Sequence, residues 1–333
     1  MATLVTGVAG FIGSAVAQAL ARPGEPVIGI DCLVPYYRLD LKEARLARLE
    51  RPGFFLARTD FADMAALDEA VAAAEGRLGP VTRIVHLGAQ PGVRWSIEHP
   101  HDYARSNLVG HLNLLELARR LQVPMVYASS SSVYGGNDKL PFAVEDRVDR
   151  PISLYAATKK ADELLSESYA HLYRIPLTGL RFFTVYGPWG RPDMAVWQFT
   201  ESCLQGRMVR IFNQGRMRRD FTYVDDIVAG VLACLQRPPE DDGLEKPGGS
   251  LSPHSIYNIG NNRSEALMHL VELVEQACGR PLLREYAPMQ PGDVKDTFAD
   301  ISAIAQDHGF APRTRLDEGI PRFVDWFRSW ARP

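Results

Sequence analysis

Short apolar runs alternate with longer amphipathic segments through the first half of the chain. The runs are rich in β-branched residues, which predicts strands, whereas the segments between them carry apolar residues at helical spacing. The predicted strands are Ala2–Thr6, Pro26–Asp31, Phe54–Ala57, Arg83–Leu87, Met125–Ser129 and Leu177–Phe182. The predicted helices are Ile12–Ala21, Leu39–Glu50, Met64–Ala74, Leu108–Leu121 and Tyr155–Leu172. This alternation predicts an α/β fold with a Rossmann-type doubly wound parallel sheet.

The pattern becomes irregular after Phe182, where Gly, Pro and Arg are frequent. A short strand is predicted again at Ile256–Ile259, with helices near Ala266–Cys278 and Leu316–Trp330. We therefore expect a smaller C-terminal α/β substrate domain that closes over the first domain and forms a ligand cleft with it. The predicted boundaries are 1–180 plus about 220–255 for the Rossmann domain, and about 181–219 plus 256–333 for the substrate domain. Residues 238–249 are dense in turn formers and charge, which predicts an exposed loop.

The composition is that of a soluble globular protein, with 333 residues, 46% hydrophobic and 23% charged. A net charge of -3 gives no basic surface, so neither nucleic acid nor a membrane is an expected partner. Neither a signal peptide nor a spanning apolar run is expected. The cysteines lack the spacing of a zinc site or a disulfide framework, so we expect no metal and a reducing, cytoplasmic location. They are Cys32, Cys203, Cys234 and Cys278.

Three glycines separate the first predicted strand from the first predicted helix: Gly7, Gly10 and Gly13. Glycines at such a turn allow the backbone to approach a pyrophosphate at the helix N-terminus. The second predicted strand ends at Asp31. A carboxylate at that place can accept a hydrogen bond from an adenine ribose hydroxyl and repels a ribose phosphate. The motif therefore predicts a dinucleotide site that prefers NAD to NADP.

Two further strand ends fit this site. Asp60 follows the third strand, where its side chain can meet the adenine amine, and Leu87-Gly-Ala-Gln90 ends the fourth strand beside the pyrophosphate. Each has a structural alternative as a helix cap or a strand-end turn, and both readings stay open.

Tyr155 and Lys159 stand one helical turn apart, so the phenol and the ammonium project from the same face. A cation beside a phenol favours the phenolate, and such a Tyr can act as a base near neutral pH. The preceding predicted strand runs into the serines 129–132. That position is the carboxyl end of a sheet strand, where ligands bind in open α/β folds. The pattern therefore predicts an active site rather than a surface pair.

Taken together, these residues resemble the extended short-chain dehydrogenase/reductase family over almost the entire chain. Five segments look like the UDP-glucuronate 4-epimerases of that family: Gln90–Arg94, Ser106–Gly110, Tyr127–Gly135, Arg181–Met194 and Met289–Asp293. The segment from Arg181 is the most specific. One departure is Pro91, which stands where a small residue is usual and restricts the residue before it. The resemblance implies tightly held NAD, a UDP-sugar substrate and a two-domain form that is often a homodimer.

The resemblance also implies roles for individual residues. Tyr155 would be the catalytic base, Lys159 would lower its pKa and hold the nicotinamide ribose, and Ser130 would hydrogen-bond the sugar 4-hydroxyl. Three hydroxyls would face the uronate carboxylate, those of Ser131, Ser132 and Thr184. Arg219 would clamp the diphosphate, Arg191 would lie near the sugar, and Gln290 and Asp293 would line the nucleotide pocket. The full expected cofactor set is Gly7, Gly10, Phe11, Ile12, Gly13, Asp31, Asp60, Phe61, Leu87, Gly88, Ala89, Gln90, Asn107, Ser129, Tyr155, Lys159 and Phe182. The full expected substrate set is Arg94, Ser130, Ser131, Ser132, Tyr155, Thr184, Arg191, Val196, Phe212, Arg219, Gln290 and Asp293.

The expected reaction is the C4 epimerisation of UDP-glucuronate to UDP-galacturonate through a transient 4-keto sugar. Dehydratases and decarboxylases of the family usually carry acidic residues where Ser131 and Ser132 stand here, which argues against those reactions. Two alternatives stay open. One is a UDP-glucose/UDP-galactose 4-epimerase, and the other is a non-catalytic, NAD-sensing scaffold, against which the intact Ser130, Tyr155 and Lys159 argue.

Overall fold

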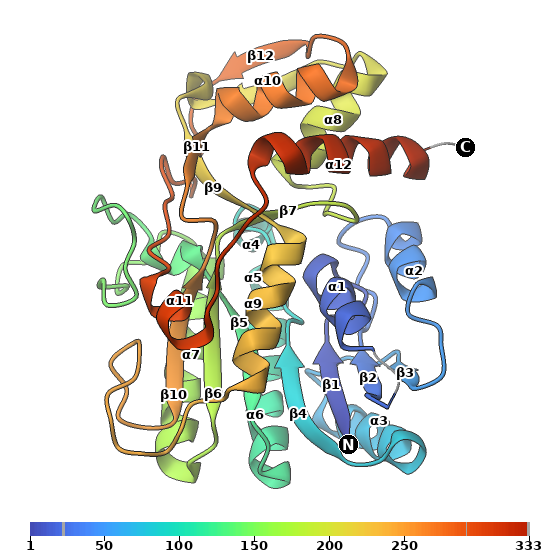
Figure 1. The fold of residues 1–333 in the computed structure, drawn as a ribbon, viewed down its shortest axis with the longest axis vertical. Coiled ribbons are helices and arrows are strands. Elements are labelled where there is room, and N and C mark those ends of the chain that lie inside the picture. Colours follow the sequence, from blue (N-terminus) through green and yellow to red (C-terminus); the bar gives the residue numbers. More distant parts are fainter. Residues whose placement is uncertain (22–23, 291, 332–333) are drawn as a thin grey trace.

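The computed structural model describes residues 1–21, 24–290 and 292–331. Seven parallel strands form its central sheet (Figure 1), in the order β10-β6-β5-β4-β1-β2-β3. The strands are β1 (Ala2–Thr6), β2 (Val27–Ile30), β3 (Phe54–Ala57), β4 (Val81–His86), β5 (Met125–Ser130), β6 (Leu177–Phe182) and β10 (His254–Ile259). The order reverses between β1 and β4, which places a crevice at the carboxyl ends of these two strands.

Helices cover both faces of this sheet, so its central strands are buried on two sides and read as nearly continuous apolar runs. Within β1, Val5 packs into one core cluster, whereas Ala2 and Leu4 pack into the other. One face is covered by α1 (Phe11–Leu20), α9 (Val224–Gln236) and α11 (Ser302–His308), with α2 (Leu39–Ala47) beside α1. The opposite face is covered by α3 (Met64–Leu78), α6 (Gly110–Leu121) and α7 (Leu154–Tyr173).

The start of α7 is fixed locally, and this matters because the predicted catalytic pair lies in its first turns. Ser153 caps the helix, with its side chain accepting a hydrogen bond from the backbone N–H of Ala156 at 3.1 Å. Between β4 and α6 the chain forms α4 (Trp95–Glu98), α5 (Pro100–Tyr103) and a π-helical turn, η1 (Ala104–Val109). After β5 it forms a 3₁₀ turn, η2 (Ser131–Tyr134).

A smaller unit lies beyond the carboxyl ends of the strands, at the top of Figure 1. Its sheets are β11-β9-β7, in which β9 pairs parallel with β7 and antiparallel with β11, and the parallel pair β12-β8. Its strands are β7 (Thr184–Tyr186), β8 (Val209–Phe212), β9 (Arg218–Tyr223), β11 (Ser264–Ala266) and β12 (Arg284–Ala287). Its helices are α8 (Ala195–Gln205), α10 (Leu267–Cys278) and α12 (Leu316–Trp330), with a 3₁₀ turn, η3 (Asn213–Gly215), after β8.

The predicted fold class is confirmed, and each strand predicted in the first half is present within two residues of its expected ends. One expected boundary needs correction. Residues 256–333 were assigned to the substrate domain, but β10 pairs with β6 in the large sheet, and α11 packs against β10. The predicted loop 238–249 lies outside helices and strands and is largely exposed. Within the described part of the chain, no helix is long and apolar enough to cross a membrane.

Candidate active site

A cavity of about 730 Å³ opens between the carboxyl ends of the central strands and the smaller unit. Its volume lies in the range of ligand and cofactor sites. The cavity is lined by all of the predicted site residues except Asn107, Val196 and Gln290. The fold thus gathers into one place residues that are widely separated in the sequence.

The glycine turn at one end of the cavity can take a pyrophosphate only because side chains are missing there. Gly7 has a φ of +70°, and a Cβ on Gly13 or Gly10 would lie 2.1 Å or 2.8 Å from the carbonyl oxygen of Gly7. Gly10 is also the N-cap of α1 and offers no capping side chain. The first N–H groups of α1 therefore remain available to an anion, which fits a dinucleotide.

Asp31 stands beside this turn, and its carboxylate is held by backbone donors. One oxygen accepts from the N–H of Ala9 at 2.9 Å and the other from the N–H of Leu33 at 2.8 Å. Each oxygen keeps a lone pair for a further donor, because a carboxylate can accept about four hydrogen bonds. The side chain lines the cavity. This placement fits the predicted hydrogen bond from the adenine ribose hydroxyl of NAD to Asp31.

Asp60 and Asn107 are tied to the protein around the same end of the cavity. Asp60 accepts from the N–H of Ala62 at 2.9 Å and pairs with Arg105 at 2.8 Å, so it caps a local turn while also lining the cavity. Asn107 lies behind the wall: it accepts from the N–H of Gln90 at 2.8 Å and donates to the Gln90 carbonyl at 3.2 Å. Asn107 therefore positions the loop after β4.

The predicted catalytic residues line the middle of the cavity. Ser130 ends β5, and its hydroxyl accepts from the N–H of Ser132 at 3.2 Å and donates to the Ser132 hydroxyl at 3.1 Å. Tyr155 enters from α7, with its ring edge-on to that of Tyr103 at 6.1 Å. The Lys159 ammonium donates to the carbonyl oxygen of Ala128 at 3.0 Å and to Asp162 at 2.9 Å.

A buried ion pair fixes α7 against the sheet below these residues, and sequence reasoning missed it. Arg181 in β6 donates twice to Glu163, at 2.8 Å and 3.0 Å, and the Ser129 hydroxyl donates to the same carboxylate at 2.7 Å. Burial works against the charge of Glu163, but Arg181 outweighs it and holds the pKa of Glu163 below its usual value. The sequence shows Lys160 three residues before Glu163, a spacing at which the two pair in α7, but it does not show that Arg181 in β6 is the buried partner of Glu163.

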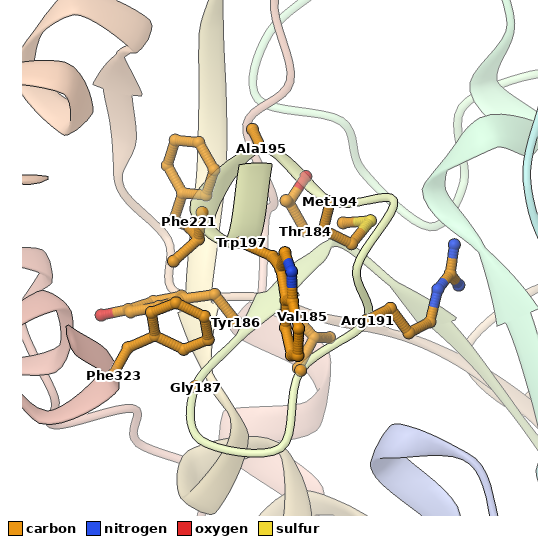
Figure 2. A pocket seen from close by; sticks show the side chains of 12 residues that line it. Thr184, Val185, Tyr186, Gly187, Arg191, Met194, Ala195, Trp197, Phe221 and Phe323 are labelled. Atoms are coloured by element: carbon orange, nitrogen blue, oxygen red, sulfur yellow. The ribbon is translucent and has the colours of Figure 1, made fainter. Parts of the chain in front are cut away.

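The far end of the cavity is formed by the smaller unit. Thr184 begins β7, and Figure 2 shows it beside a small apolar pocket that contains Trp197, Phe221 and Phe323. Val196 lines this small pocket and not the large cavity. Its position therefore does not support the predicted contact with the substrate. The side chain of Arg191 points away from these aromatic rings.

The arginines of this end are held by acceptors within the protein. Arg191 binds Asp193 at 3.0 Å and 2.5 Å, and Asp193 also accepts from the Tyr36 hydroxyl at 3.1 Å. Arg219 donates to the carbonyl oxygens of Lys295 at 2.8 Å and Val294 at 2.5 Å. Both guanidinium groups therefore have fixed positions at the cavity wall.

Arg45 in α2 is a further residue of this region that no sequence motif indicates. Its guanidinium is fully buried and donates to the carbonyl oxygens of Ala9, Trp189 and Gly190 at 2.7–3.1 Å. It therefore joins the glycine turn to the loop that carries Arg191.

The comparisons with known proteins agree with this geometry. A model of the NAD dependent epimerase/dehydratase family matches residues 3–260. The chain is 47% identical over 335 residues to a probable UDP-glucuronate 4-epimerase of Rhizobium meliloti, covering 98% of this chain and 97% of that protein.

Solved structures are similar over the whole chain. The UDP-glucuronic acid 4-epimerase from Bacillus cereus, in complex with UDP-glucuronic acid and NAD, superposes with a TM-score of 0.87 at 30% identity, covering 99% of this chain and 100% of that one. A UDP-glucose 4-epimerase from Thermotoga maritima with UDP-glucose gives a TM-score of 0.86 at 29% identity, with 100% of both chains covered. With the dinucleotide turn, the Tyr–Lys pair and these matches together, the chain belongs to the NAD dependent epimerase/dehydratase family and is an NAD-dependent enzyme.

Proposed function

We propose that this enzyme converts UDP-glucuronate to UDP-galacturonate by NAD-dependent epimerisation at C4. One observation carries the proposal: a single cavity connects the glycine turn and Asp31 with Ser130, Tyr155 and Thr184. Relatives and structural neighbours named UDP-glucuronate 4-epimerases support the choice of substrate. The proposal keeps the two-domain division, with β10 moved to the Rossmann domain.

The C4 hydrogen of the sugar is not acidic, so its inversion needs an oxidation followed by a reduction. When bound, NAD supplies the hydride acceptor and donor for these two steps. Tyr155 takes the proton of the 4-hydroxyl during oxidation and gives it back during reduction. Lys159 brings a positive charge to the cavity and holds the nicotinamide ribose, and Ser130 hydrogen-bonds the same sugar oxygen. The 4-keto sugar turns over in the cavity between the two steps, which exposes its opposite face.

The rest of the cavity binds the other parts of the substrate. The hydroxyls of Ser131, Ser132 and Thr184 hold the uronate carboxylate. Arg219 binds the diphosphate by charge-assisted hydrogen bonds, and Arg191 lies near the sugar. The uridine end is assigned to Phe212, Gln290 and Asp293, with Arg94 at its edge. These residues line the cavity, except Gln290, whose role rests on the family resemblance alone.

A UDP-glucose 4-epimerase is the second candidate, because one such enzyme has the same fold with UDP-glucose bound. A neutral hydroxymethyl group would replace the carboxylate in that reaction. A non-catalytic scaffold is the third, but the cavity keeps Ser130, Tyr155 and Lys159 together.

We also propose a homodimer. The adjacent helices α6 and α7, with the turn before α6, expose apolar side chains that a second copy would cover. These are Val109 (47% exposed), Leu112 (37%), Leu164 (59%) and Leu172 (62%). A cytoplasmic location is proposed on separate grounds, because all four cysteines are free thiols.

A panel of UDP-sugars tests the proposed function. Purified enzyme is incubated separately with UDP-glucuronate, UDP-glucose and UDP-xylose, and the products are identified by mass spectrometry and NMR. We expect UDP-galacturonate from the first and little or no turnover of the other two. Rapid conversion of UDP-glucose with no conversion of UDP-glucuronate would favour the second candidate, and inactivity on all three would favour the scaffold.

A further inference from the structure

Asp162 lies on α7, three residues after Lys159, at the inner side of the active site. The Asp162 side chain is fully buried, and one of its carboxylate oxygens accepts from the Lys159 ammonium at 2.9 Å. The other carboxylate oxygen has no hydrogen-bond partner among the described residues. Lys159 itself is only 3% exposed, so both members of the pair are shielded from water.

This arrangement is costly for the folded protein. A buried carboxylate is normally satisfied at both oxygens, and an unpartnered buried oxygen loses its hydration without compensation. Burial raises the pKa of Asp162 to about 6, even though the charge and hydrogen bond of Lys159 work in the opposite direction. A gain in stability therefore does not explain why an acid stands at this position.

The other titratable groups packed around the pair add little charge of their own. Burial lowers the pKa of His86 in β4 to about 3, lowers that of His111 in α6 well below its usual value, and raises that of Tyr127 in β5, which keeps all three neutral. The adjacent Glu163 is paired with Arg181 at 2.8 Å and with Lys160 at 3.3 Å. Asp162 is the charged group that directly hydrogen-bonds the Lys159 ammonium.

We propose that Asp162 is a positioning residue for Lys159: it holds the ammonium in place and offsets part of the positive charge that acts on Tyr155. The inference deepens the proposed function and rests on it. Two acceptors, the Ala128 carbonyl and Asp162, take two of the three ammonium protons. Lys159 also lines the cavity, where the nicotinamide ribose and the Tyr155 oxygen are expected.

The two effects of Asp162 can be separated by substitution. Asp162→Asn keeps an oxygen that accepts from Lys159 but removes the negative charge. The uncompensated ammonium then favours the Tyr155 phenolate more strongly. Asp162→Ala removes both the charge and the acceptor, so Lys159 also loses its orientation. Asp325→Asn serves as the matched control, because Asp325 forms an exposed pair with Arg328 at the same helical spacing in α12, away from the cavity.

The experiment measures kcat for UDP-glucuronate from about pH 5 to 9, and the NAD retained per chain after gel filtration, for the NAD-loaded wild type and the three variants. We expect the acid limb of the kcat profile to move to lower pH by about 1 pH unit in both Asp162 variants. Only Asp162→Ala should also lose retained NAD and fall on the order of tenfold in kcat at the optimum. Asp325→Asn should match the wild type.

An acid limb that stays in place, or moves to higher pH, in a folded Asp162→Asn or Asp162→Ala variant would overturn the proposal. So would equal NAD retention and kcat in Asp162→Ala and the wild type. Failure of the proposed function gives a distinct result: the wild type itself would not convert UDP-glucuronate at any pH.

Discussion

Arg94 and Asp293 form an ion pair across the mouth of the cavity, with 3.0 Å between the guanidinium nitrogen and the carboxylate oxygen. Arg94 follows β4 in the large unit, whereas Asp293 lies in the segment after β12 in the smaller one. The Arg94 guanidinium also lies over the ring of Phe212, 4.8 Å from its centroid. Both charged residues were predicted to contact the substrate, and in the structure they bind each other.

The Arg94–Asp293 pair should affect how tightly the substrate is held and not the rate of the chemical step. We expect Arg94→Ala to raise the KM for UDP-glucuronate by about two- to fivefold with little change in kcat, since exposed ion pairs contribute about 0.2–1 kcal/mol. Steady-state kinetics measures both constants. Arg147→Ala is a suitable control, because Arg147 pairs with Asp149 on the surface, outside the cavity lining. A large loss of kcat in Arg94→Ala would contradict a retention role.

Substitution of the proposed base should abolish most turnover. Tyr155→Phe removes the proton acceptor but keeps the ring, so kcat should fall between about 10² and 10⁴ fold while substrate affinity stays within a few-fold. Ser130→Ala should be milder, with a loss on the order of 10² fold. Affinity is measured by calorimetry and turnover by product analysis. Near-normal kcat in Tyr155→Phe would show that another group moves the proton.

The proposed hydrogen bonds to the uronate carboxylate should suppress the loss of CO₂ from the oxidised sugar. Oxidation at C4 makes a β-keto acid, which decarboxylates when the bond to the carboxylate aligns with the carbonyl π system. In the proposed mechanism, hydrogen bonds from Ser131, Ser132 and Thr184 would hold the carboxylate out of that alignment by positioning. We expect Thr184→Val, or the Ser131→Ala/Ser132→Ala pair, to raise the yield of UDP-4-keto-pentose, CO₂ and NADH per epimerisation. Stoichiometric CO₂ release by the wild type would instead identify a decarboxylase.

Acid stability should depend on buried histidines. Burial lowers the pKa of His111, so the folded state disfavours its protonation. Its contribution to stability is complete above the unfolded value of about 6.5 and is lost as pH falls below that value. His111→Gln, which can keep a hydrogen bond to Ser166, should reduce the loss in unfolding free energy between pH 7.5 and 5 by about 2 kcal/mol.

Urea unfolding at the two pH values checks this. Asp162 and Asp220 act in the opposite direction, because burial raises the pKa of each to about 6, but they are present in both proteins. Parallel losses in the wild type and His111→Gln would mean that His111 does not carry the effect.

The first half of the fold could be read from the sequence because local patterns determine it. Strands buried on both faces give apolar runs, and the glycine turn with Asp31 and the Tyr155–Lys159 spacing locate the cavity. The second half was harder. β10 pairs with β6, residues 254–259 with 177–182, and nothing in the local sequence shows that pairing. In β7, β8, β9 and α8 the Gly-, Pro- and Arg-rich sequence obscured the strands and the helix.

Site residues were missed where burial decides their role. Asp162 stands at helical pairing distance from Lys159, but the sequence does not show that both side chains are enclosed. Arg45 resembles any surface arginine of an amphipathic helix until the carbonyl oxygens of Ala9 and Trp189 are found around it. Asn107, which the resemblance places at the cofactor, hydrogen-bonds the backbone of Gln90 and the Thr158 hydroxyl, and its contact with the cofactor stays a prediction.

The central claim is that C4 is inverted by oxidation and reduction within one cavity. UDP-glucuronate labelled with deuterium at C4 tests it most directly, with product analysis by NMR and mass spectrometry. We predict UDP-galacturonate that retains the deuterium at C4 with no label in water, because the hydride never leaves the enzyme. Loss of the C4 label to solvent in the epimerised product would contradict this account.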